Sequence, residues 1–406
     1  MTSKMSPLAR SALVGSRRAT SLALALFVFG FGEELWFRYL PEYLRALGAT
    51  AFTVGLFGTA KDFLDAAYAY PGGWISDRLG TRRALLLFGA LSTLGFAVLW
   101  LWQSIAGVFA GLVLVMAWAS LGLPATFALV GEELEGSRRV VGFTVQAILK
   151  RLPILLAPPL GGLLLSRFGM KSGIRIGLAV SIVLSIGMLL GLARALRPRE
   201  APSAAPAARR VGPPPSSRLP PGLRHLLAAD CLIRLCEGLP EVFLVVWAIE
   251  IVHVTPAQFG LLVSVLMATA IVSYLPAAAL AGRAEKKPFV LLTYAFFTAY
   301  PLAVYLSHSF AGLVAASVVG GLREIGEPAR KALIVDLAEP SARGRSVGVY
   351  YAIRGFAVAG AAAVGGALWT VAPSLTFLTA TGLGVAGTLW AARFLPASPA
   401  IGREHP

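Results

Sequence analysis

The chain has 406 residues, of which 57% are hydrophobic and only 14% are charged. A soluble domain carries about 25% charged residues, so this composition excludes an ordinary soluble fold and predicts an integral membrane protein. The formal net charge is +16 at pH 7. Lysine and arginine concentrate in alternate connections, as the positive-inside rule predicts, so the charge does not indicate nucleic-acid binding.

Long apolar segments recur along the chain, and each exceeds the roughly 9–11 residues of a membrane β-strand. A segment in lipid must satisfy its backbone hydrogen bonds internally, so we expect an all-α integral membrane protein. The first segment follows a basic stretch and is too long for the apolar region of a signal peptide, which predicts an uncleaved span. Twelve transmembrane helices are predicted, at 20–46, 52–76, 83–103, 105–130, 140–165, 174–195, 223–250, 256–281, 288–306, 309–335, 346–371 and 374–395.

The predicted spans form two groups of six, separated by a stretch rich in proline, alanine and arginine. This stretch has too little apolar surface to fold alone and is typical of a linker. We therefore expect an N-terminal six-helix bundle at 1–196, a cytoplasmic linker at 197–222 and a C-terminal six-helix bundle at 223–406. The distribution of basic residues predicts that both termini are cytoplasmic. A monomer in a bacterial inner membrane is expected.

The segment 73–83 joins the second and third predicted spans and reads Gly-Trp-Ile-Ser-Asp-Arg-Leu-Gly-Thr-Arg-Arg. Asp77 falls at a cytoplasmic helix C-terminus, where the helix dipole disfavours a carboxylate. It therefore needs an arginine or the N-terminus of another helix as a partner. Gly80 permits a tight reversal of the chain, and Arg82 and Arg83 hold the connection on the cytoplasmic side.

The spacing G-x-x-x-D-R-x-G-x-R-R resembles the loop signature of the major facilitator superfamily, a large group of secondary transporters. Sequence similarity between the two halves supports the resemblance, because Val54-Gly55-Leu56 matches Phe259-Gly260-Leu261 and Gly161-Gly162 matches Gly365-Gly366. The resemblance implies two six-helix bundles in parallel repeat. It also implies that this segment forms a cytoplasmic gate, in which the partner of Asp77 is Glu132, Glu133 or the start of the eleventh span. The residues assigned to the gate are Gly73, Asp77, Arg78, Gly80, Arg82 and Arg83.

Ionisable residues inside a predicted span are costly in lipid unless they are paired or hydrated, so each is a candidate functional residue. Glu34 and Arg38 are four residues apart and share one helix face. A charged stripe is predicted on the seventh span (Arg234, Glu237, Glu241), and a second stripe, in which the signs alternate, on the tenth span (Arg323, Glu327, Arg330). In the family that the chain resembles, the first, fourth, seventh and tenth spans line the central cavity.

Burial favours the neutral form of a carboxylate and a nearby arginine favours the charged form, so such a pair can exchange a proton. The candidates for proton coupling are Glu34, Glu237, Glu241, Asp62 and Glu327. The candidates for contact with the substrate are Arg38, Arg234, Arg323, Tyr39, Tyr68 and Trp247. The alternative is that the ion pairs lock helices together and that the aromatic residues are packing groups.

The sequence Ala157-Pro158-Pro159-Leu160-Gly161-Gly162 in the fifth span resembles the G-P-x-x-G-G signature of proton antiporters that export drugs. Ala157 stands where that signature has its first glycine, and a plain packing motif is the alternative. Exporters of this kind carry an arginine four residues before a glycine in the fourth span. Here Trp118 stands at that position, before Gly122, so a proton-coupling role for the fourth span is in doubt.

Enzyme motifs such as H-E-x-x-H, the P-loop and G-x-S-x-G are absent from the sequence, so we expect no enzyme and no cofactor. Cys231 and Cys236 are five residues apart and do not form a metal pair. The leading prediction is a secondary transporter that exports a small organic solute by alternating access, as a proton antiporter. The alternatives are proton-coupled uptake of an organic anion or zwitterion, and a membrane-embedded enzyme or receptor.

Overall fold

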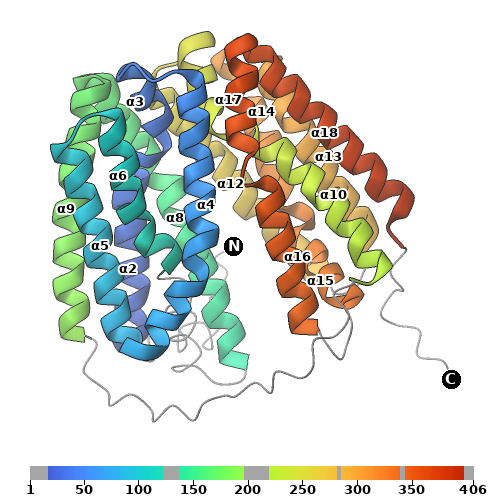
Figure 1. The fold of residues 1–406 in the computed structure, drawn as a ribbon, viewed down its shortest axis with the longest axis horizontal. Helices are drawn as coiled ribbons and strands as arrows, with labels where there is room; N and C mark the ends of the chain where they lie inside the picture. Colours follow the sequence, from blue (N-terminus) through green and yellow to red (C-terminus); the bar gives the residue numbers. More distant parts are fainter. Residues whose placement is uncertain (1–16, 122–136, 196–218, 281–284, 339–342, 397–406) are drawn as a thin grey trace, which may run out of the picture. The chain divides into compact units, whose positions relative to one another are not determined.

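The computed structural model describes residues 17–121, 137–195, 219–280, 285–338 and 343–396. Every regular element within these ranges is helical, which confirms the all-α prediction for the described part of the chain (Figure 1). The chain divides into two compact units, Met1–Gly48 with Ala60–Ala207 and Ala49–Thr59 with Ala208–Pro406. Residues 49–59 therefore group with the second unit. The division into domains at 197–222 stays a prediction, because most of that linker lies outside the described residues.

The first unit is built from α2 (Arg17–Glu34), α3 (Leu40–Ala46), most of α4 (Ala51–Leu79), α5 (Thr81–Leu101), α6 (Ile105–Met116), α8 (Ser137–Phe168) and α9 (Met170–Ala195). Helix α2 packs against α8 and α9, and α5 packs against α6 and α9. The π-helical turn η2 (Ala117–Leu121) continues α6. The predicted span 105–130 can be followed only to residue 121, because residues 122–136 lie outside the described ranges.

The second unit contains α10 (Pro221–Gly238), α11 (Leu244–Val246), α12 (Pro256–Leu280), α13 (Lys286–Tyr305), α14 (Phe310–Leu322), α15 (Glu327–Leu337), α16 (Arg343–Val358), α17 (Ala361–Val371) and α18 (Pro373–Phe394). Helix α18 packs against α10, α13 and α17, and α12 packs against α14. Short turns join some of these helices: η3 (Glu241–Phe243) and η4 (Trp247–Ile251) flank α11, and η5 (Arg323–Gly326) links α14 to α15.

Four predicted spans are interrupted where a continuous helix was expected. The span 20–46 breaks between Glu34 and α3, which carries Pro41 in its first turn, and the span 223–250 breaks after Gly238, next to Pro240. Proline cannot donate a backbone hydrogen bond and clashes with the preceding turn, which explains both breaks. The spans 309–335 and 346–371 break at η5 and between α16 and α17.

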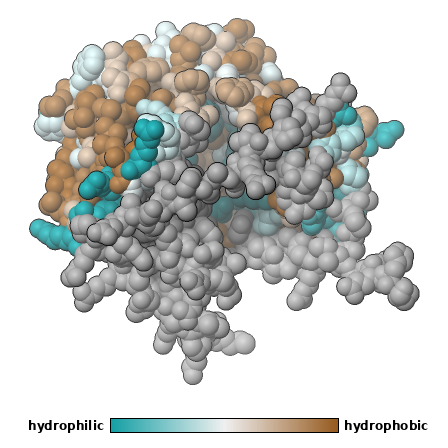
Figure 2. Space-filling view, turned by 60° about the horizontal axis from the view of Figure 1, so that its bottom comes forward, coloured by the Kyte–Doolittle hydropathy of each residue, from teal (hydrophilic) through white to brown (hydrophobic). Residues whose placement is uncertain are grey.

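Six of the described segments are long and apolar enough to cross a membrane: Arg82–Leu101, Met170–Arg194, Pro256–Ser273, Lys286–Tyr305, Ser346–Val371 and Pro373–Phe394. Many of their large apolar side chains are exposed, among them Val183 at 70%, Phe356 at 78% and Val371 at 76%. Figure 2 shows apolar residues over much of the flank of the first unit and hydrophilic residues toward the end that faces the viewer. Outward-facing apolar side chains suit a helix surrounded by lipid, whereas the full count of twelve spans stays a prediction.

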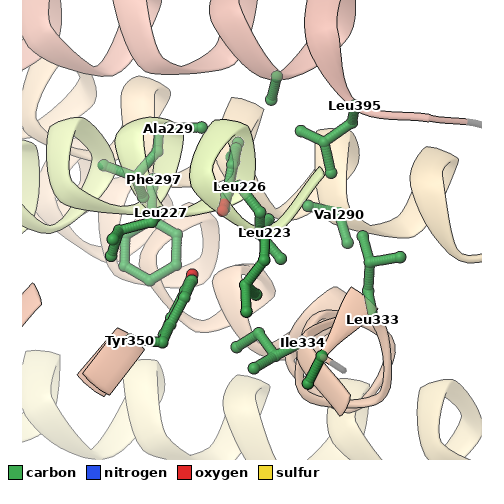
Figure 3. Close-up of a cluster of buried hydrophobic side chains, with 14 residues drawn as sticks. Leu223, Leu226, Leu227, Ala229, Val290, Phe297, Leu333, Ile334, Tyr350 and Leu395 are labelled. Atoms are coloured by element: carbon green, nitrogen blue, oxygen red, sulfur yellow. The ribbon is translucent and has the colours of Figure 1, made fainter. Parts of the chain in front are cut away.

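The largest apolar core described in the second unit joins α10, α13, α15, α16 and α18 (Figure 3). Leu223 and Leu226 of α10 meet Val290 of α13 and Leu333 of α15, and all four are fully buried. Tyr294 and Tyr350 also belong to this cluster. Their rings anchor α13 and α16 in the core, which leaves their hydroxyl groups to find polar partners.

Gly161 and Gly365, which match each other in the sequences of the two halves, make equivalent packing contacts. A Cβ on Gly161 would collide with the carbonyl oxygen of Leu35, and a Cβ on Gly365 would collide with that of Leu239. Leu35 and Leu239 lie at the two proline-associated breaks. Each glycine therefore lets its helix approach the backbone where the preceding helix is interrupted.

We expect Gly161→Ala to lower the stability of the protein by about 1–3 kcal/mol, because the added Cβ must displace backbone atoms. Gly187→Ala is the matched control, since nothing lies within 4 Å of a Cβ at that position in α9. It should be neutral or slightly stabilising. Thermal unfolding of the two variants in detergent measures the difference, and equal midpoints would contradict the packing role of Gly161.

Candidate functional site

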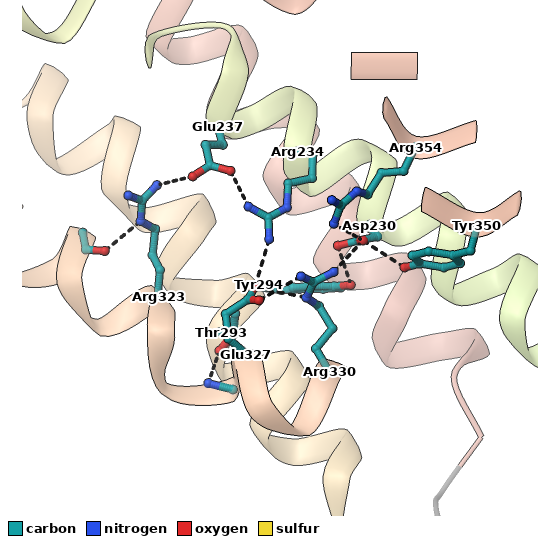
Figure 4. A network of polar contacts seen from close by, with 12 residues as sticks. Asp230, Arg234, Glu237, Thr293, Tyr294, Arg323, Glu327, Arg330, Tyr350 and Arg354 are labelled. Carbon is teal, nitrogen blue, oxygen red and sulfur yellow. Dashed lines mark hydrogen bonds and ion pairs between the residues drawn. The ribbon is translucent and has the colours of Figure 1, made fainter. Parts of the chain in front are cut away.

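A network of charged side chains crosses the second unit along one face of α10 (Figure 4). Asp230, Arg234 and Glu237 follow the spacing i, i+4, i+7, which places them on the same side of the helix. Their partners come from three other elements: Arg323 from η5, Glu327 and Arg330 from α15, and Arg354 from α16. Residues far apart in the sequence are thus joined into one set of ion pairs.

Asp230 holds the most buried part of this network, with a side chain that is 1% exposed. Its Oδ2 accepts hydrogen bonds from Arg330 Nη1 at 2.7 Å and from the Tyr350 hydroxyl at 2.9 Å. Arg330 also donates to both carboxylate oxygens of Glu327, at 3.1 and 2.8 Å. A buried charge is tolerated only when it is paired and hydrogen-bonded, and these contacts meet that condition.

Glu237 lies at the more exposed end of the network. Its carboxylate joins two guanidinium groups, with Arg234 Nη1 at 2.6 Å from Oε2 and Arg323 Nη1 at 3.3 Å from Oε1. Its side chain is 28% exposed, against 8% for Glu327. The ring of Phe297 lies against both guanidinium groups, 5.0 Å from Arg234 and 4.9 Å from Arg323. Glu237 is therefore a partly exposed carboxylate shared by two arginines through charge-assisted contacts.

The predicted stripe on the seventh span is wrong in one respect. Helix α10 ends at Gly238, and Glu241 lies beyond Pro240 in the turn η3, with an exposed side chain. The helical face is therefore formed by Asp230, Arg234 and Glu237 instead. Asp230 was missed in the sequence analysis, although it is a carboxylate in an apolar segment four residues before Arg234, and this spacing was the available signal.

In the first unit, Glu34 and Arg38 form the expected pair. Arg38 donates to both oxygens of Glu34, at 2.7 and 3.3 Å, across the break that follows α2. The Tyr39 hydroxyl donates to the carbonyl oxygen of Pro158 at 2.7 Å and is buried. This bond fastens the break to α8. The described contacts of Tyr39 therefore favour a packing role over contact with a substrate.

The remaining candidates lie in different surroundings. The Tyr68 hydroxyl donates to the carbonyl oxygen of Val113 at 2.8 Å. Asp62 forms an ion pair with the neighbouring Lys61, with Oδ1 and Nζ 3.4 Å apart. Trp247 is 5% exposed and packs against Trp369 and Phe377. These contacts of Trp247 agree with the alternative that it is a packing residue. The functional roles assigned to these residues stay predictions.

The predicted gate segment is described in part. Gly80, between α4 and α5, has a φ of +77°, a conformation that favours glycine and forms the expected reversal. Arg78 lies over the ring of Trp74 at 4.0 Å, Arg82 Nη2 donates to the carbonyl oxygen of Ala193 at 2.9 Å, and Arg83 is exposed. Arg82 thereby caps the C-terminal end of α9. The surroundings of Gly73, the side chain of Asp77 and the whole of Glu132 and Glu133 lie outside the description.

The position on the fourth span where exporters carry an arginine is occupied here by the buried side chain of Trp118. Its ring stacks on Phe29 with the centroids 4.2 Å apart, and its side chain is buried. The position is therefore part of an apolar core between η2 and α2. Among the residues that the structure describes, no group of three histidine, cysteine or acidic side chains could hold a metal ion.

We expect Asp230→Asn to destabilise the second unit far more than Glu237→Gln. The first change removes one of the two carboxylates that neutralise the buried Arg330 and leaves Glu327 shared between Arg330 and Arg234, an uncompensated buried charge that costs about 3–5 kcal/mol. The second change affects a partly exposed pair, worth about 1 kcal/mol or less. Thermal unfolding of both variants in detergent measures the difference. Similar losses would mean that Asp230 does not anchor the network.

Comparison with known proteins gives a family model described as Major Facilitator Superfamily, which matches residues 22–236 and 226–405. An uncharacterized MFS-type transporter of Mycobacterium tuberculosis is 28% identical over 152 residues. That match spans 37% of this chain and only 36% of the relative.

Solved structures share the fold over nearly the whole chain. A peptide transporter is 18% identical with a TM-score of 0.72, and the match covers 93% of each chain. The human organic anion transporter MFSD10 is 20% identical with a TM-score of 0.62, covering 92% of this chain and 99% of its own. A bacterial homologue of the human lysosomal transporter Spinster is 13% identical with a TM-score of 0.68, covering 94% and 98%. At these identities the likeness shows the fold alone.

Proposed function

Since the chain belongs to the major facilitator superfamily, we propose that it is a proton-coupled secondary transporter of a small organic anion or zwitterion, working by alternating access. Proteins of this family and fold are transporters rather than enzymes, and the chain is an integral, multi-pass membrane protein. The substrate, the coupling ion and the direction of transport are parts of the proposal.

The observation that supports an anionic substrate is the carboxylate of Glu237 held between Arg234 and Arg323. Two guanidinium groups recognise any carboxylate in the same way, through charge-assisted hydrogen bonds. Protonation of Glu237 would weaken its hold on both arginines and leave their N–H groups to a substrate carboxylate. Release of the proton would restore the internal pair and expel the substrate. Proton and anion thus become coupled through one pair of arginines.

The names of structural neighbours agree with an anionic substrate. One is a human organic anion transporter, and peptide transporters of the same fold were solved in complex with sulfate and, in a related case, with 5-aminolevulinic acid. Export by proton antiport is the second candidate, favoured by the segment that begins at Ala157. Its contacts, Gly161 against Leu35 and Pro158 with Tyr39, are also explained by packing, so this segment supports export less strongly.

We expect Glu237→Gln to abolish transport driven by a pH gradient but to retain exchange of substrate against substrate. The amide cannot release a proton, whereas the two arginines still bind an anion. Glu285→Gln is the matched control, because Glu285 is exposed and lies outside the network. Uptake and counterflow of radiolabelled carboxylates in proteoliposomes separate the two activities. Unchanged gradient-driven transport in Glu237→Gln would show that Glu237 does not couple transport to protons.

Glu34 is the second candidate for proton coupling, since it forms a local pair with Arg38 at a helix break. We expect Glu34→Gln to slow transport driven by a pH gradient, in the same proteoliposomes. An intermediate loss in this variant and a complete loss in Glu237→Gln would assign the main proton step to the second unit. If gradient-driven transport persists unchanged in Glu34→Gln, then Glu34 has no part in coupling.

The proposed location is a bacterial inner membrane, with both termini cytoplasmic and the protein monomeric. Basic residues in the predicted inside connections support this orientation. Fluorescent-protein and alkaline phosphatase fusions at the C-terminus test it. Fluorescence without phosphatase activity is the expected result, and the reverse pattern would invert the proposed topology.

A further inference from the structure

Arg354 is held less tightly than the other arginines of the network. It lies on α16, one helical turn after Tyr350, and its Nη1 approaches Asp230 Oδ2 at 3.3 Å. Its side chain is 23% exposed, and its guanidinium lies over the ring of Tyr351 at 4.6 Å. A guanidinium carries five N–H donors. Within the described residues only one of these has a hydrogen-bond partner, so most of the donors of Arg354 remain available.

Asp230 does not need Arg354 as a counter-ion. The Oδ2 atom of Asp230 already accepts from Arg330 at 2.7 Å and from Tyr350 at 2.9 Å, which are both shorter contacts. A carboxylate oxygen has two lone pairs. Arg354 is therefore a third donor at a saturated oxygen, and a purely structural ion pair is a poor explanation for its position.

The charges of the network divide into a balanced buried part and an unbalanced rim. Asp230 and Glu327 balance Arg330 and Arg234 in the buried part. The rim has one carboxylate, Glu237, which pairs with Arg323, and one further arginine, Arg354, whose carboxylate partner is the already balanced Asp230. In surroundings of low dielectric a positive charge that is not balanced by a carboxylate of its own is costly. One more anionic group at this rim would complete the pairing of the residues joined in Figure 4.

The two rim arginines approach α10 at positions seven residues apart. Arg354 meets the helix at Asp230 and Arg323 meets it at Glu237. An α-helix rises 1.5 Å per residue, so the two places are separated by about 10 Å. A single small carboxylate cannot reach both guanidinium groups.

We propose that Arg354 forms a second anion-binding site, so that the substrate is an organic dianion whose two anionic groups lie about 10 Å apart. One group takes the place of Glu237 at Arg234 and Arg323, and the other binds the available donors of Arg354. This inference rests on the proposed function and specifies the class of substrate. An extended dicarboxylate meets the requirement, whereas a short one such as succinate does not.

The test uses the purified full-length protein and straight-chain dicarboxylates from succinate to dodecanedioate. The matched probe is the monomethyl ester of nonanedioate, which keeps the length and removes one charge. Ligand binding stabilises the native state by RT ln(1 + L/Kd), where L is the ligand concentration, so dissociation constants follow from the dependence of the thermal midpoint on ligand concentration. We expect binding to peak at an intermediate chain length and to fall about tenfold for the monoester.

Variants identify the residue responsible for the preference. Arg354→Gln should bind dianion and monoester with equal affinity, while Arg393→Gln, which removes a charge from an exposed position near the end of α18, should keep the preference. Arg354→Lys keeps the charge and replaces Arg354→Gln in the test if the glutamine variant does not fold. It should retain part of the preference for the dianion over the monoester. Preference for the dianion that survives in Arg354→Gln would overturn the inference.

A separate readout distinguishes failure of the inference from failure of the proposed function. If Arg323→Gln abolishes counterflow of monocarboxylates while dianion and monoester bind the wild type equally, only the second site is wrong. If no carboxylate binds or exchanges in an Arg323-dependent way, both proposals are wrong.

Discussion

The buried carboxylate of Asp230 is the constraint on which the second unit depends. It lies within an apolar core, where an ionised group is tolerated only with nearly complete pairing. Arg330, Tyr350 and Tyr294 supply that pairing from α15, α16 and α13. Since each donor comes from a different helix, the carboxylate fixes how these three helices pack around α10. The aromatic rings of the two tyrosines join this polar contact to the surrounding apolar cluster.

In the proposed function, this fixed centre supports a rim whose ion pairs can change. With Arg330 and Glu327 locked in place, Arg234 is held at 2.9 Å from Glu327 and presents its other donor to Glu237. A site that must bind and release an anion needs guanidinium groups that stay in position while the internal carboxylate changes. Exposure increases along α10 from Asp230 to Glu237, which places the proposed exchange of anions at the accessible end and the fixed ion pairs at the buried end.

The two halves repeat in backbone more than in chemistry. Both have a helix broken near a proline and a glycine packed on the carbonyl at the break, Gly161 on Leu35 and Gly365 on Leu239. Helices α6 and α14 also begin alike, with Ser104 and Ser309 accepting from the backbone N–H three residues on. These contacts are set by close approach of backbones, which tolerates few residue types. The charged network belongs to the second unit, and in the first unit Glu34 and Arg38 form a local pair at the corresponding break.

Composition and apolar segment length were sufficient to predict an all-α membrane protein, because lipid leaves the backbone few alternatives. The glycine matches between halves and the charged residues of α10 and α15 were also readable from spacing. Sequence alone could not show that Pro240 removes Glu241 from the helical face, nor that Asp230 is the centre of the network. Those facts depend on donors from α13, α15 and α16, which are between about sixty and 125 positions away in the chain. Only the folded structure brings such distant partners within hydrogen-bonding distance, and that proximity decides which charges are fixed and which remain available.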